Sequence, residues 1–394
     1  MADTFTETTS QGWLSRLMGS IKSVLVGLVL FAVSFPVLFL NEGRAVQTAK
    51  SLTEGKGAVV SVAADTVGPA NESKLVHLNG EATTTETLTD SDFGVSANAI
   101  KLIRDVEMYQ WQEDKKSETK KKLGGGEETV TTYTYAKTWS SRTIDSSDFK
   151  EPTGHTNPGE FPVQAHTTTA SKVTLGAFTL SSGLVDSLDE STPLAVDAGQ
   201  LPASMRGKAQ ASGSGYYIGG NPSSPQVGDV RVTFKAVKPA VVSVVARQVR
   251  ETFEPYQTQA GDALLMLRYG TLSATAMFEA AERENTILTW VLRFAGFLCM
   301  FFGLTMIFRP IAVFADVIPL FGTLLGAGIG IFAGLTAAIL SLLVIAVAWI
   351  FFRPLLGITL LLLAIGGIVL LVRVGLKKRA ARAATPGTAQ RGAA

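Results

Sequence analysis

The residues that could perform chemistry are few, and no catalytic or metal-binding pattern groups them. The three histidines, His77, His155 and His166, lack the spacing of ligands on a helix or in a zinc knuckle. Segment 180–184 contains two serines but lacks the G-x-S-x-G nucleophile elbow. The triple glycine at 124–126 is not followed by the Lys-Ser/Thr of a phosphate-binding loop. The sequence therefore predicts no catalytic residue, no metal and no cofactor.

A membrane-tethered hydrolase is the enzymatic alternative, and it would use the serines of segment 181–182 or His155. The acidic residues Asp105 and Glu107 alternate with apolar residues, which is typical of the solvated face of a strand. Cys299, the one cysteine, falls in an apolar run, so no disulfide framework or thiolate metal site is expected. We therefore expect a protein that is not an enzyme.

Four apolar segments and one long polar insert must position these residues. The first segment, 21–40, is about 20 residues long, which at roughly 1.5 Å per residue matches a hydrocarbon core about 30 Å thick. A signal peptide is the alternative, but the run is longer than a usual signal core and Asn-Glu-Gly-Arg follows it. The expected fold class is a membrane protein with four transmembrane α-helices and a large β-rich α+β extracytoplasmic domain, residues 41–288, inserted between helices 1 and 2.

The other three expected spans lie toward the C-terminus. Pro310, which follows Arg309, is expected to end the second span. The apolar run 318–352 is too long for one crossing and slightly short for two crossings with a turn, so part of this region is expected to form an interfacial or re-entrant segment. Arg353 and Pro354 predict a tight turn before the last span. The expected boundaries are 289–308 for helix 2, 311–324 for the interfacial or re-entrant segment, 325–352 for helix 3 and 355–374 for helix 4.

Charge predicts the orientation. The insert contains 24 Lys and Arg against 30 Asp and Glu, whereas the tail, 375–394, contains basic residues and no acid. By the positive-inside rule, this disordered tail and the N-terminal segment 1–20 are cytoplasmic. The insert is then periplasmic, or lumenal in a eukaryotic cell. The basic tail is expected to act as a topology signal, with contact to anionic lipid headgroups as the alternative.

Glycines recur every four residues in the third expected span and would share one helical face. The four positions are Gly322, Gly326, Gly330 and Gly334. Such stripes of small residues let helix backbones approach closely in bilayers. The stripe could mediate packing between copies of the chain or packing within one bundle, and the sequence does not decide between them. Gly296 and Gly303 of the second span could form the complementary groove.

Intramembrane charge is nearly absent. Arg293 is the one ionisable residue inside an expected span, about one turn from its end, where the side chain can reach the interface. Proton-coupled or ion-coupled transport normally uses buried acidic residues, so it is disfavoured. A pore formed by several copies of the chain is not excluded by this argument.

The insert is expected to be mainly strands with helices at both borders. Residues 41–52 are expected to continue the first helix, and Ser273 to cap a helix that runs from Ala274 into the second span. Val, Thr, Tyr and Phe are frequent in the expected strands. These strands are 74–79, 102–112, 130–140, 172–180, 229–237, 241–249 and 263–268.

A long hairpin is expected near the middle of the insert. Tyr109 and Trp111 alternate on one strand, and Tyr133 and Tyr135 alternate on the other. The charged, glycine-containing stretch 115–128 would connect them. Its lysines alternate with acidic residues, so a solvated loop is expected and nucleic acid is not a partner.

Several motifs in order resemble the LUMA family, also called transmembrane protein 43. They are LNEGRAVQTAKSLTEG from Leu40, YQW from Tyr109, GHTNP from Gly154, LSSGLVD from Leu180, VGDVRVTF from Val227, ARQ from Ala246, AGDALLML from Ala260 and WIFFRPL from Trp349. The resemblance covers nearly the whole chain. It implies four spans, a large lumenal loop, self-association and no catalytic residues. The matching positions, best interpreted as fold positions, are Asn41, Glu42, Gly43, Arg44, Asn157, Pro158, Gly228, Asp229, Arg353 and Pro354.

The resemblance also implies a location and partners. Eukaryotic members of the family reside in the endoplasmic reticulum and inner nuclear membrane and are linked to lamins and emerin, partners that transfer poorly to this chain. The Ala/Gly-rich tail suggests a bacterial member, located in the inner membrane with both termini cytoplasmic. The resulting hypothesis is a non-enzymatic membrane scaffold whose partners are its own copies, membrane lipids and other membrane proteins. An oligomeric channel or lipid-handling protein is the alternative.

Overall fold

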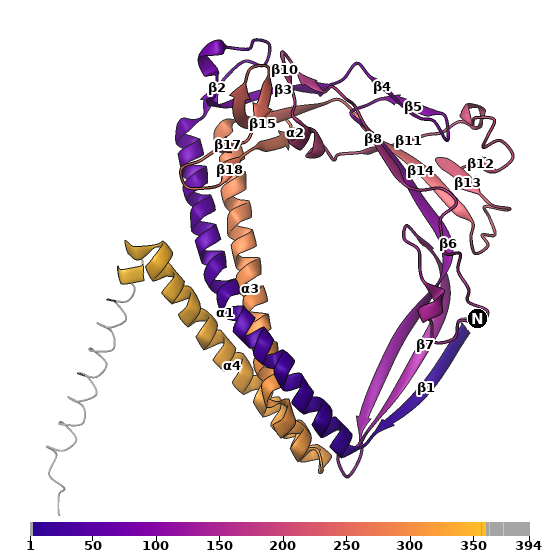
Figure 1. Ribbon diagram of the computed structural model, residues 1–394, viewed down its shortest axis with the longest axis vertical. Helices are drawn as coiled ribbons and strands as arrows, with labels where there is room; N and C mark the ends of the chain where they lie inside the picture. Colours follow the sequence, from indigo (N-terminus) through magenta and orange to yellow (C-terminus); the bar gives the residue numbers. More distant parts are fainter. Residues whose placement is uncertain (1–2, 356, 360–361, 363–372, 374–394) are drawn as a thin grey trace, which may run out of the picture. The chain divides into compact units, whose positions relative to one another are not determined.

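The computed structural model describes residues 3–355, 357–359, 362 and 373, which divide between two compact units. The first unit comprises Met1–Gly19, Thr48–Asn285 and Val313–Thr323, and the second comprises Ser20–Gln47, Thr286–Ala312 and Leu324–Ala394. The long helices labelled in Figure 1 therefore contribute residues to both units.

The helices are α1 (Trp13–Ala58), α2 (Ser182–Asp186), α3 (Ala274–Ala315) and α4 (Pro319–Phe352), with short 3-10 turns at Pro69–Asn71, Ser146–Asp148 and Ala198–Gln200. The strands are β1 (Asp3–Gln11), β2 (Val60–Ser61), β3 (Leu75–Thr83), β4 (Thr87–Asp90), β5 (Val95–Asn98), β6 (Lys101–Lys121), β7 (Glu127–Ser140), β8 (His166–Thr169), β9 (Thr174–Leu175), β10 (Phe178–Thr179), β11 (Thr192–Leu194), β12 (Ala209–Ser212), β13 (Gly215–Ile218), β14 (Val230–Val237), β15 (Ala240–Val249), β16 (Thr252–Glu254), β17 (Tyr256–Gln257), β18 (Ala263–Leu264) and β19 (Met266–Tyr269).

Two sheets of the first unit share one hydrophobic core. One sheet has the strand order β1-β7-β6-β14-β13-β12, and the other has the order β19-β15-β16-β10-β9-β3-β2 with β15 also paired to β3. Val106 of β6 lies opposite Val232 of β14 in the first sheet, and Leu78 of β3 lies opposite Val244 of β15 in the second. All four side chains belong to the same buried cluster. Val106 and Val232 alternate with polar residues, which is the period of two that a half-buried strand requires.

Most strands that the sequence predicts are confirmed. The expected strands at 229–237 and 241–249 are β14 and β15, and the one at 74–79 is β3. The expected strand at 172–180 is instead two short strands, β9 and β10, because Gly176 turns the chain with φ of +59°. A left-handed residue of this kind is most easily supplied by glycine.

The central hairpin is longer than its sequence indicates. Strands β6 and β7 pair without interruption from Met108↔Ser140 to Lys121↔Glu127, so the connection is residues 122–126 and not the whole of 115–128. The charged stretch is strand because its threonines and serines form a cross-strand ladder. Thr119 and Thr129 hydroxyls lie 2.9 Å apart, and those of Ser117 and Thr131 lie 3.0 Å apart.

Strand β1 extends this sheet beyond β7. It pairs antiparallel with β7 from Asp3↔Tyr135 to Gln11↔Glu127. The N-terminal segment, for which the sequence indicated no element, is thus part of the β-rich unit.

The borders of the β-rich unit are helical, as expected. Helix α1 continues through residues 41–52 to Ala58, and Ser273 Oγ accepts a hydrogen bond from Ala276 N at 3.2 Å at the start of α3. Leu52 and Phe278 from these two helices pack with Leu75 and Val245 of the second sheet in one buried cluster. Both helices are therefore anchored to the sheet by apolar contact.

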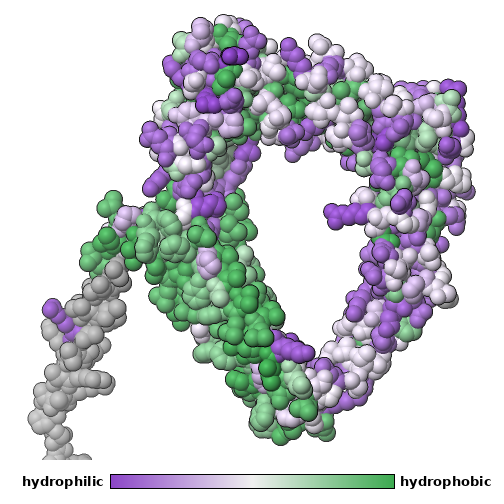
Figure 2. Space-filling model, in the orientation of Figure 1, coloured by the Kyte–Doolittle hydropathy of each residue, from purple (hydrophilic) through white to green (hydrophobic). Residues whose placement is uncertain are grey.

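The described part of the second unit consists of apolar helices. In the described residues three helices, α1, α3 and α4, are long and apolar enough to cross a membrane. Their exposed side chains are mostly Leu, Ile, Val and Phe, which give the helices the hydrophobic surface coloured green in Figure 2. Within this unit Leu38, Met300 and Leu304 pack against Ala333 and Ala337. These observations define a membrane protein with apolar helices and a large β-rich domain.

The proline at 310 does not end a helix, contrary to the sequence-based expectation. Helix α3 runs through Pro310 to Ala315, and α4 begins at Pro319. An apolar helix tolerates proline because only one backbone hydrogen bond is lost and neighbouring groups can satisfy the freed carbonyl. Residues 311–324 are thus the end of α3, a short turn and the start of α4. The expected fourth span, 355–374, lies almost entirely outside the described residues.

Candidate functional site: polar clusters on the apolar helices

A buried carboxylate, Glu42, joins α1, α3 and α4 in the second unit. Its side chain is fully buried, and Arg293 Nε and Nη2 lie 2.6 and 2.9 Å from its two oxygens. Trp349 Nε1 donates a third hydrogen bond at 2.8 Å. The guanidinium of Arg293 also lies over the ring of Trp290, 4.7 Å from its centroid. These donors occupy both carboxylate oxygens, so Glu42 is arranged as a structural ion pair rather than as a free acid or base.

The residues beside Glu42 explain the rest of the Asn-Glu-Gly-Arg motif. Asn41 Nδ2 donates to the carbonyl of Thr289 at 3.1 Å, and Arg44 Nη2 donates to Thr289 Oγ1 at 3.1 Å. A Cβ at Gly43 would come within 2.8 Å of the Phe352 ring, so glycine lets this ring pack closely on α1. The motif therefore binds α1 to α3 and α4.

Arg353 and Pro354 stand where α4 ends. Arg353 N donates to the carbonyl of Trp349 at 2.8 Å, and the carbonyl of Arg353 accepts from Gly357 N at 2.9 Å. Sequence reasoning had considered Arg293 a lone charge that reaches the interface. The signal that it missed is that Glu42 directly follows one span, while Arg293 lies near the start of the next.

The other matching motif residues meet beside β6 in the first unit. Asn157 accepts from Trp111 N at 2.7 Å and donates to Trp111 O at 2.8 Å, which replaces a strand partner at this point. Gly228 N donates to Tyr109 O at 2.9 Å, and Tyr109 N donates to Asp229 O at 2.8 Å. A Cβ at Gly228 would lie 3.3 Å from Pro158. These positions supply hydrogen-bond partners to the backbone groups of Tyr109 and Trp111.

Asp229 also has a side-chain role. Its Oδ2 accepts from Tyr217 Oη at 2.5 Å and from Gln226 N at 2.7 Å. Burial and this hydrogen bond raise the pKa of Tyr217 above its ordinary value. Tyr217 is therefore a neutral donor that holds the 226–229 turn.

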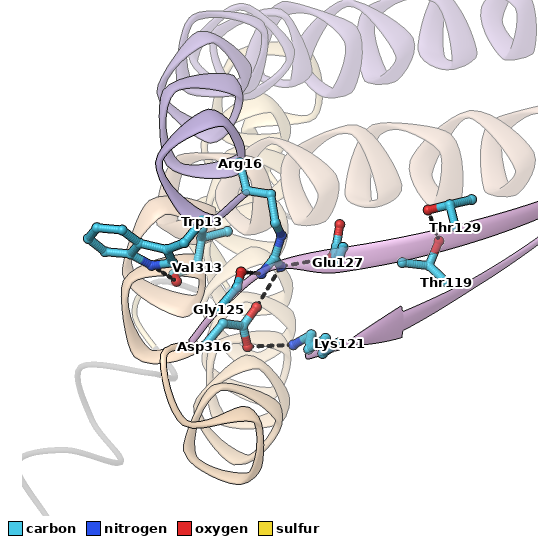
Figure 3. Close-up of polar contacts among 9 residues, drawn as sticks. All are labelled: Trp13, Arg16, Thr119, Lys121, Gly125, Glu127, Thr129, Val313 and Asp316. Carbon is cyan, nitrogen blue, oxygen red and sulfur yellow. Dashed lines mark hydrogen bonds and ion pairs between the residues drawn. The ribbon is translucent and has the colours of Figure 1, made fainter. Parts of the chain in front are cut away.

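A second buried charge cluster lies in the first unit, and we name it the hairpin clasp: Trp13, Arg16, Lys121, Glu127 and Asp316 (Figure 3). Arg16 Nη2 lies 2.6 Å from Asp316 Oδ2 and 2.7 Å from Glu127 Oε1. Lys121 Nζ lies 2.6 Å from Asp316 Oδ1, and Trp13 Nε1 donates to Val313 O at 3.0 Å. The clasp joins the start of α1, the end of the β6–β7 hairpin and the α3–α4 turn.

Backbone contacts complete the hairpin clasp. Arg16 donates to the carbonyl of Gly125, and Gly124 N donates to Val317 O at 3.1 Å. Gly125 has φ of +79°, and a Cβ there would collide with the Trp13 ring. Burial raises the pKa of Asp316, but the hydrogen bonds from Lys121 and Arg16 outweigh it and hold the pKa below its ordinary value. Asp316 is thus a carboxylate at neutral pH.

The four glycines of the expected stripe have different surroundings. A Cβ at Gly322 would collide with Asp316 within the first unit, whereas one at Gly334 would lie 3.7 Å from Phe301 within the second. Among the described residues, none lies within 4 Å of a Cβ placed at Gly326 or Gly330. At 100° per residue these two share a helix face with the buried Ala333 and Ala337. The face is thus packed in one part and open in another.

Gly296 and Gly303 do not form a groove for α4. A Cβ at Gly296 would lie 2.6 Å from Leu38, and one at Gly303 would lie 2.7 Å from Phe31 N. Both glycines therefore let α1 pack closely against α3. Gly27 of α1 makes the reciprocal close approach to the carbonyl of Gly303.

An apolar groove of about 500 Å³ lies between α1 and α4 in the second unit. Phe35, Pro36 and Phe39 line one side, and Leu343 and Val347 line the other. No polar side chain is among its described lining residues, so only an apolar ligand would gain from entering it.

The two buried histidines among the candidate chemical residues are engaged structurally. His155 stacks on Tyr135 with ring centroids 4.0 Å apart, and its Nδ1 lies 2.8 Å from the carbonyl of Glu151. His77 Nε2 lies 2.9 Å from the carbonyl of Leu272. Within the described ranges, no three His, Cys, Asp or Glu residues gather in a way that could hold a metal ion.

Comparison with known proteins shows the family of this chain. The family model described as transmembrane protein 43 matches residues 108–354. The human transmembrane protein 43 is 39% identical over 361 residues, 89% of each chain, and the rat protein is 38% identical over 385 residues, 95% of each chain. A Drosophila melanogaster homolog is 31% identical over 86% of this chain and 91% of its own. No solved structure matches.

The chain is therefore a membrane protein of apolar helices with a β-rich domain. It belongs to the transmembrane protein 43 family. The three relatives named here are animal proteins, so they lend no support to the expectation of a bacterial member and a bacterial inner membrane.

Proposed function

We propose that this protein is a non-enzymatic membrane scaffold that self-associates and holds lipids or other membrane proteins in place. Its charged groups support a structural role. Glu42 and Asp316, the buried carboxylates of the two clusters, each accept from an arginine and a second donor. Groups saturated in this way are poor proton acceptors and poor metal ligands. The two carboxylates therefore serve to hold chain segments together.

The single observation that carries self-association is the open part of the small-residue face of α4. Gly326 and Gly330 would accept a Cβ without any contact among the described residues. Apolar helices associate in bilayers where small residues let two backbones approach. We propose that a second copy of the chain packs against this recess, by which we mean the open part of the α4 face at Gly326 and Gly330.

The experiment is the mass of the complex extracted directly into lipid nanodiscs. The wild-type protein should give a discrete multimer, and Gly326→Leu/Gly330→Leu should reduce its mass, because two leucines fill the recess. Ala346→Leu is the matched control, because Ala346 is exposed and lies about 180° around α4 from the two glycines. It should leave the mass unchanged.

The same variant separates self-association from packing within one bundle. If the recess is only space inside the chain, leucines that fill it should leave the mass unchanged and raise the thermal stability. That pair of results would refute the role proposed for Gly326 and Gly330.

A lipid-handling role is the second candidate, and the apolar groove at Pro36 favours it. Val347→Phe should narrow the groove, which has no polar group among its described lining residues to hold a hydrophilic ligand. Lipids that co-purify with the wild type and not with this variant would support the role. Equal lipid content in both proteins would contradict it.

A further inference from the structure

Strand β6 has one edge that is unpaired along its second half. On this edge residues 101–108 pair with β14, and Asn157 then accepts from Trp111 N and donates to Trp111 O. The opposite edge pairs with β7 as far as Lys121. From residue 113 to residue 121, no described strand pairs with the first edge. Because backbone direction alternates along a strand, the odd-numbered residues of this segment direct N–H and C=O groups out of the edge, as Trp111 does.

An open edge of this kind is a template for a strand of another chain, and charged side chains usually prevent the pairing. The order of charges here has a different effect. Segment 113–121 can be laid antiparallel against a second copy of itself about an axis at Ser117. The residues that face each other are then Asp114 and Lys120, Lys116 and Glu118, Glu113 and Lys121, and Lys115 and Thr119. No two like charges are directly opposite in this arrangement.

The charges favour this register over its neighbours. With the axis at Ser117, the odd-numbered residues form hydrogen-bonded pairs and the even-numbered residues form non-hydrogen-bonded pairs, whose side chains lie closer together. The even-numbered pairs are the ones in which an acidic residue faces a lysine on the exposed side of the strand. A shift of the axis by one residue would set Lys116 or Glu118 against its own copy, and like charges directly opposite are destabilising.

The even-numbered side chains are available for such a contact. Lys116 and Glu118 form an ion pair within the strand, with 3.4 Å between Nζ and Oε1, and their side chains are 82% and 66% exposed. Exposed pairs of this kind contribute little to stability, so each residue can exchange its partner for one in a second copy. Asp114 accepts one hydrogen bond from Gln112 at 3.2 Å, and Lys120 is exposed.

We propose that residues 113–121 of β6 pair with the same segment of a second copy of the chain, about an axis at Ser117. This inference rests on the self-association proposed above and adds a contact in the β-rich unit to the one proposed on α4. Glu113 and Lys121 already have Tyr135 and Asp316 as partners, so the contact depends on the even-numbered charges. Because these charges are exposed, the contact should weaken as the salt concentration rises.

Cysteine cross-linking of the full-length protein in a Cys299→Ser background tests the axis. The protein is oxidised in a mild detergent, where two copies can meet in any orientation. Ser117→Cys should give disulfide-linked pairs of chains, because hydrogen-bonded strand partners have Cα atoms about 5.5 Å apart, within the reach of a disulfide. Thr119→Cys is the matched control. It is also exposed and lies on the same face of β6, but its two copies would lie about 14 Å apart along the strands.

Cross-linked pairs from Ser117→Cys and not from Thr119→Cys are the expected result. Equal yields from the two positions, or no pairs from Ser117→Cys, would overturn the proposal. High salt should lower the yield from Ser117→Cys if the even-numbered charges hold the two copies together.

Charge reversal gives a second measurement in the Ser117→Cys protein. Lys116→Glu/Lys120→Glu makes the even-numbered face from 114 to 120 wholly acidic, and Asp114→Lys/Glu118→Lys makes it wholly basic. Each variant alone should lose the cross-linked pairs, and an equal mixture of the two should regain them as mixed pairs. All four side chains are exposed, so the fold should be retained. Wild-type yields from either variant alone, or no recovery in the mixture, would contradict the pairing.

The result can be separated from that of the α4 face. The hairpin contact is measured at Ser117→Cys, and the α4 contact is measured at Gly330→Cys. Loss of pairs at Ser117→Cys with pairs retained at Gly330→Cys would overturn the hairpin contact alone. The reverse result would overturn the role of α4 and support the hairpin contact.

Discussion

Arg16 and Asp316, 300 positions apart in the sequence, form a buried ion pair with 2.6 Å between Nη2 and Oδ2. Their side chains are 6% and 2% exposed, so each needs its partner. Lys121 shares the same carboxylate at 2.6 Å. One aspartate thus connects the start of α1, the hairpin and the α3–α4 turn of the first unit.

Removal of this carboxylate should loosen all three segments together. Asp316→Ala leaves Arg16 buried with only part of its partners, and breaking a buried ion pair costs about 3–5 kcal/mol. The measurement is limited proteolysis at Leu123, an exposed residue in the hairpin connection, together with thermal unfolding. Arg231→Ala is the control. Its pair with Glu107 is half-exposed, so a loss of about 0–1 kcal/mol is expected. Equal effects of the two variants would contradict the role of Asp316.

A buried tyrosine of the hairpin, Tyr135 of β7, should make stability sensitive to alkaline pH. Burial, together with the hydrogen bond from Tyr135 Oη to Glu113 at 2.7 Å, raises the pKa of Tyr135 to about 12. Because the folded state favours the neutral phenol, this contribution is complete below pH 10 and is lost as the pH rises from about 10 to 12. The free energy of unfolding, measured as a function of pH, should not show this loss in the Tyr135→Phe variant. An identical pH profile for both proteins would exclude it.

The Glu42–Arg293 pair should behave as one unit in a double-mutant cycle. Glu42→Gln leaves the guanidinium of Arg293 buried without its counter-charge, and a loss of about 3–5 kcal/mol is expected. Arg293→Gln should cost a similar amount, while the double variant should lose much less than the sum. Thermal unfolding in nanodiscs measures all three. Additive losses would show that the two residues act separately.

Close contact between α1 and α3 should depend on Gly303. A leucine there would push against Phe31 N and the carbonyl of Gly27, and overpacking of this kind typically costs about 1–3 kcal/mol. Gly328→Leu on α4 is the control, because its Cβ would meet nothing within 4 Å among the described residues. A midpoint of thermal unfolding lowered in Gly303→Leu and unchanged in Gly328→Leu is the expected result, and unchanged midpoints in both would contradict the packing.

The strands and the bordering helix of the insert could be predicted from local sequence pattern. The strand at 229–237 alternates buried with more exposed residues, the strand at 241–249 is rich in valine, and Ser273 is followed by good helix formers, so their conformations depend on nearby residues. The N-terminal segment shows the opposite case. Its threonines are compatible with a strand, but its partner β7 lies more than a hundred positions away, and no local pattern can indicate that pairing.

The polar clusters also depend on distant residues. Glu42 and Arg293 are 251 positions apart, so their pairing requires knowledge of how α1 and α3 align. Pro310 was misjudged for another reason. Its intrinsic tendency to end helices was overridden by an apolar segment that stays helical on both sides.

The central claim, self-association through the open face of α4, is tested most directly by thiol cross-linking at that face. In a Cys299→Ser background, Gly330→Cys should give a disulfide-linked pair of chains on mild oxidation of native membranes. Ala346→Cys on the opposite face should not. Cross-linked pairs for Gly330→Cys alone are the predicted result. Their absence, or equal yields from both positions, would contradict the claim.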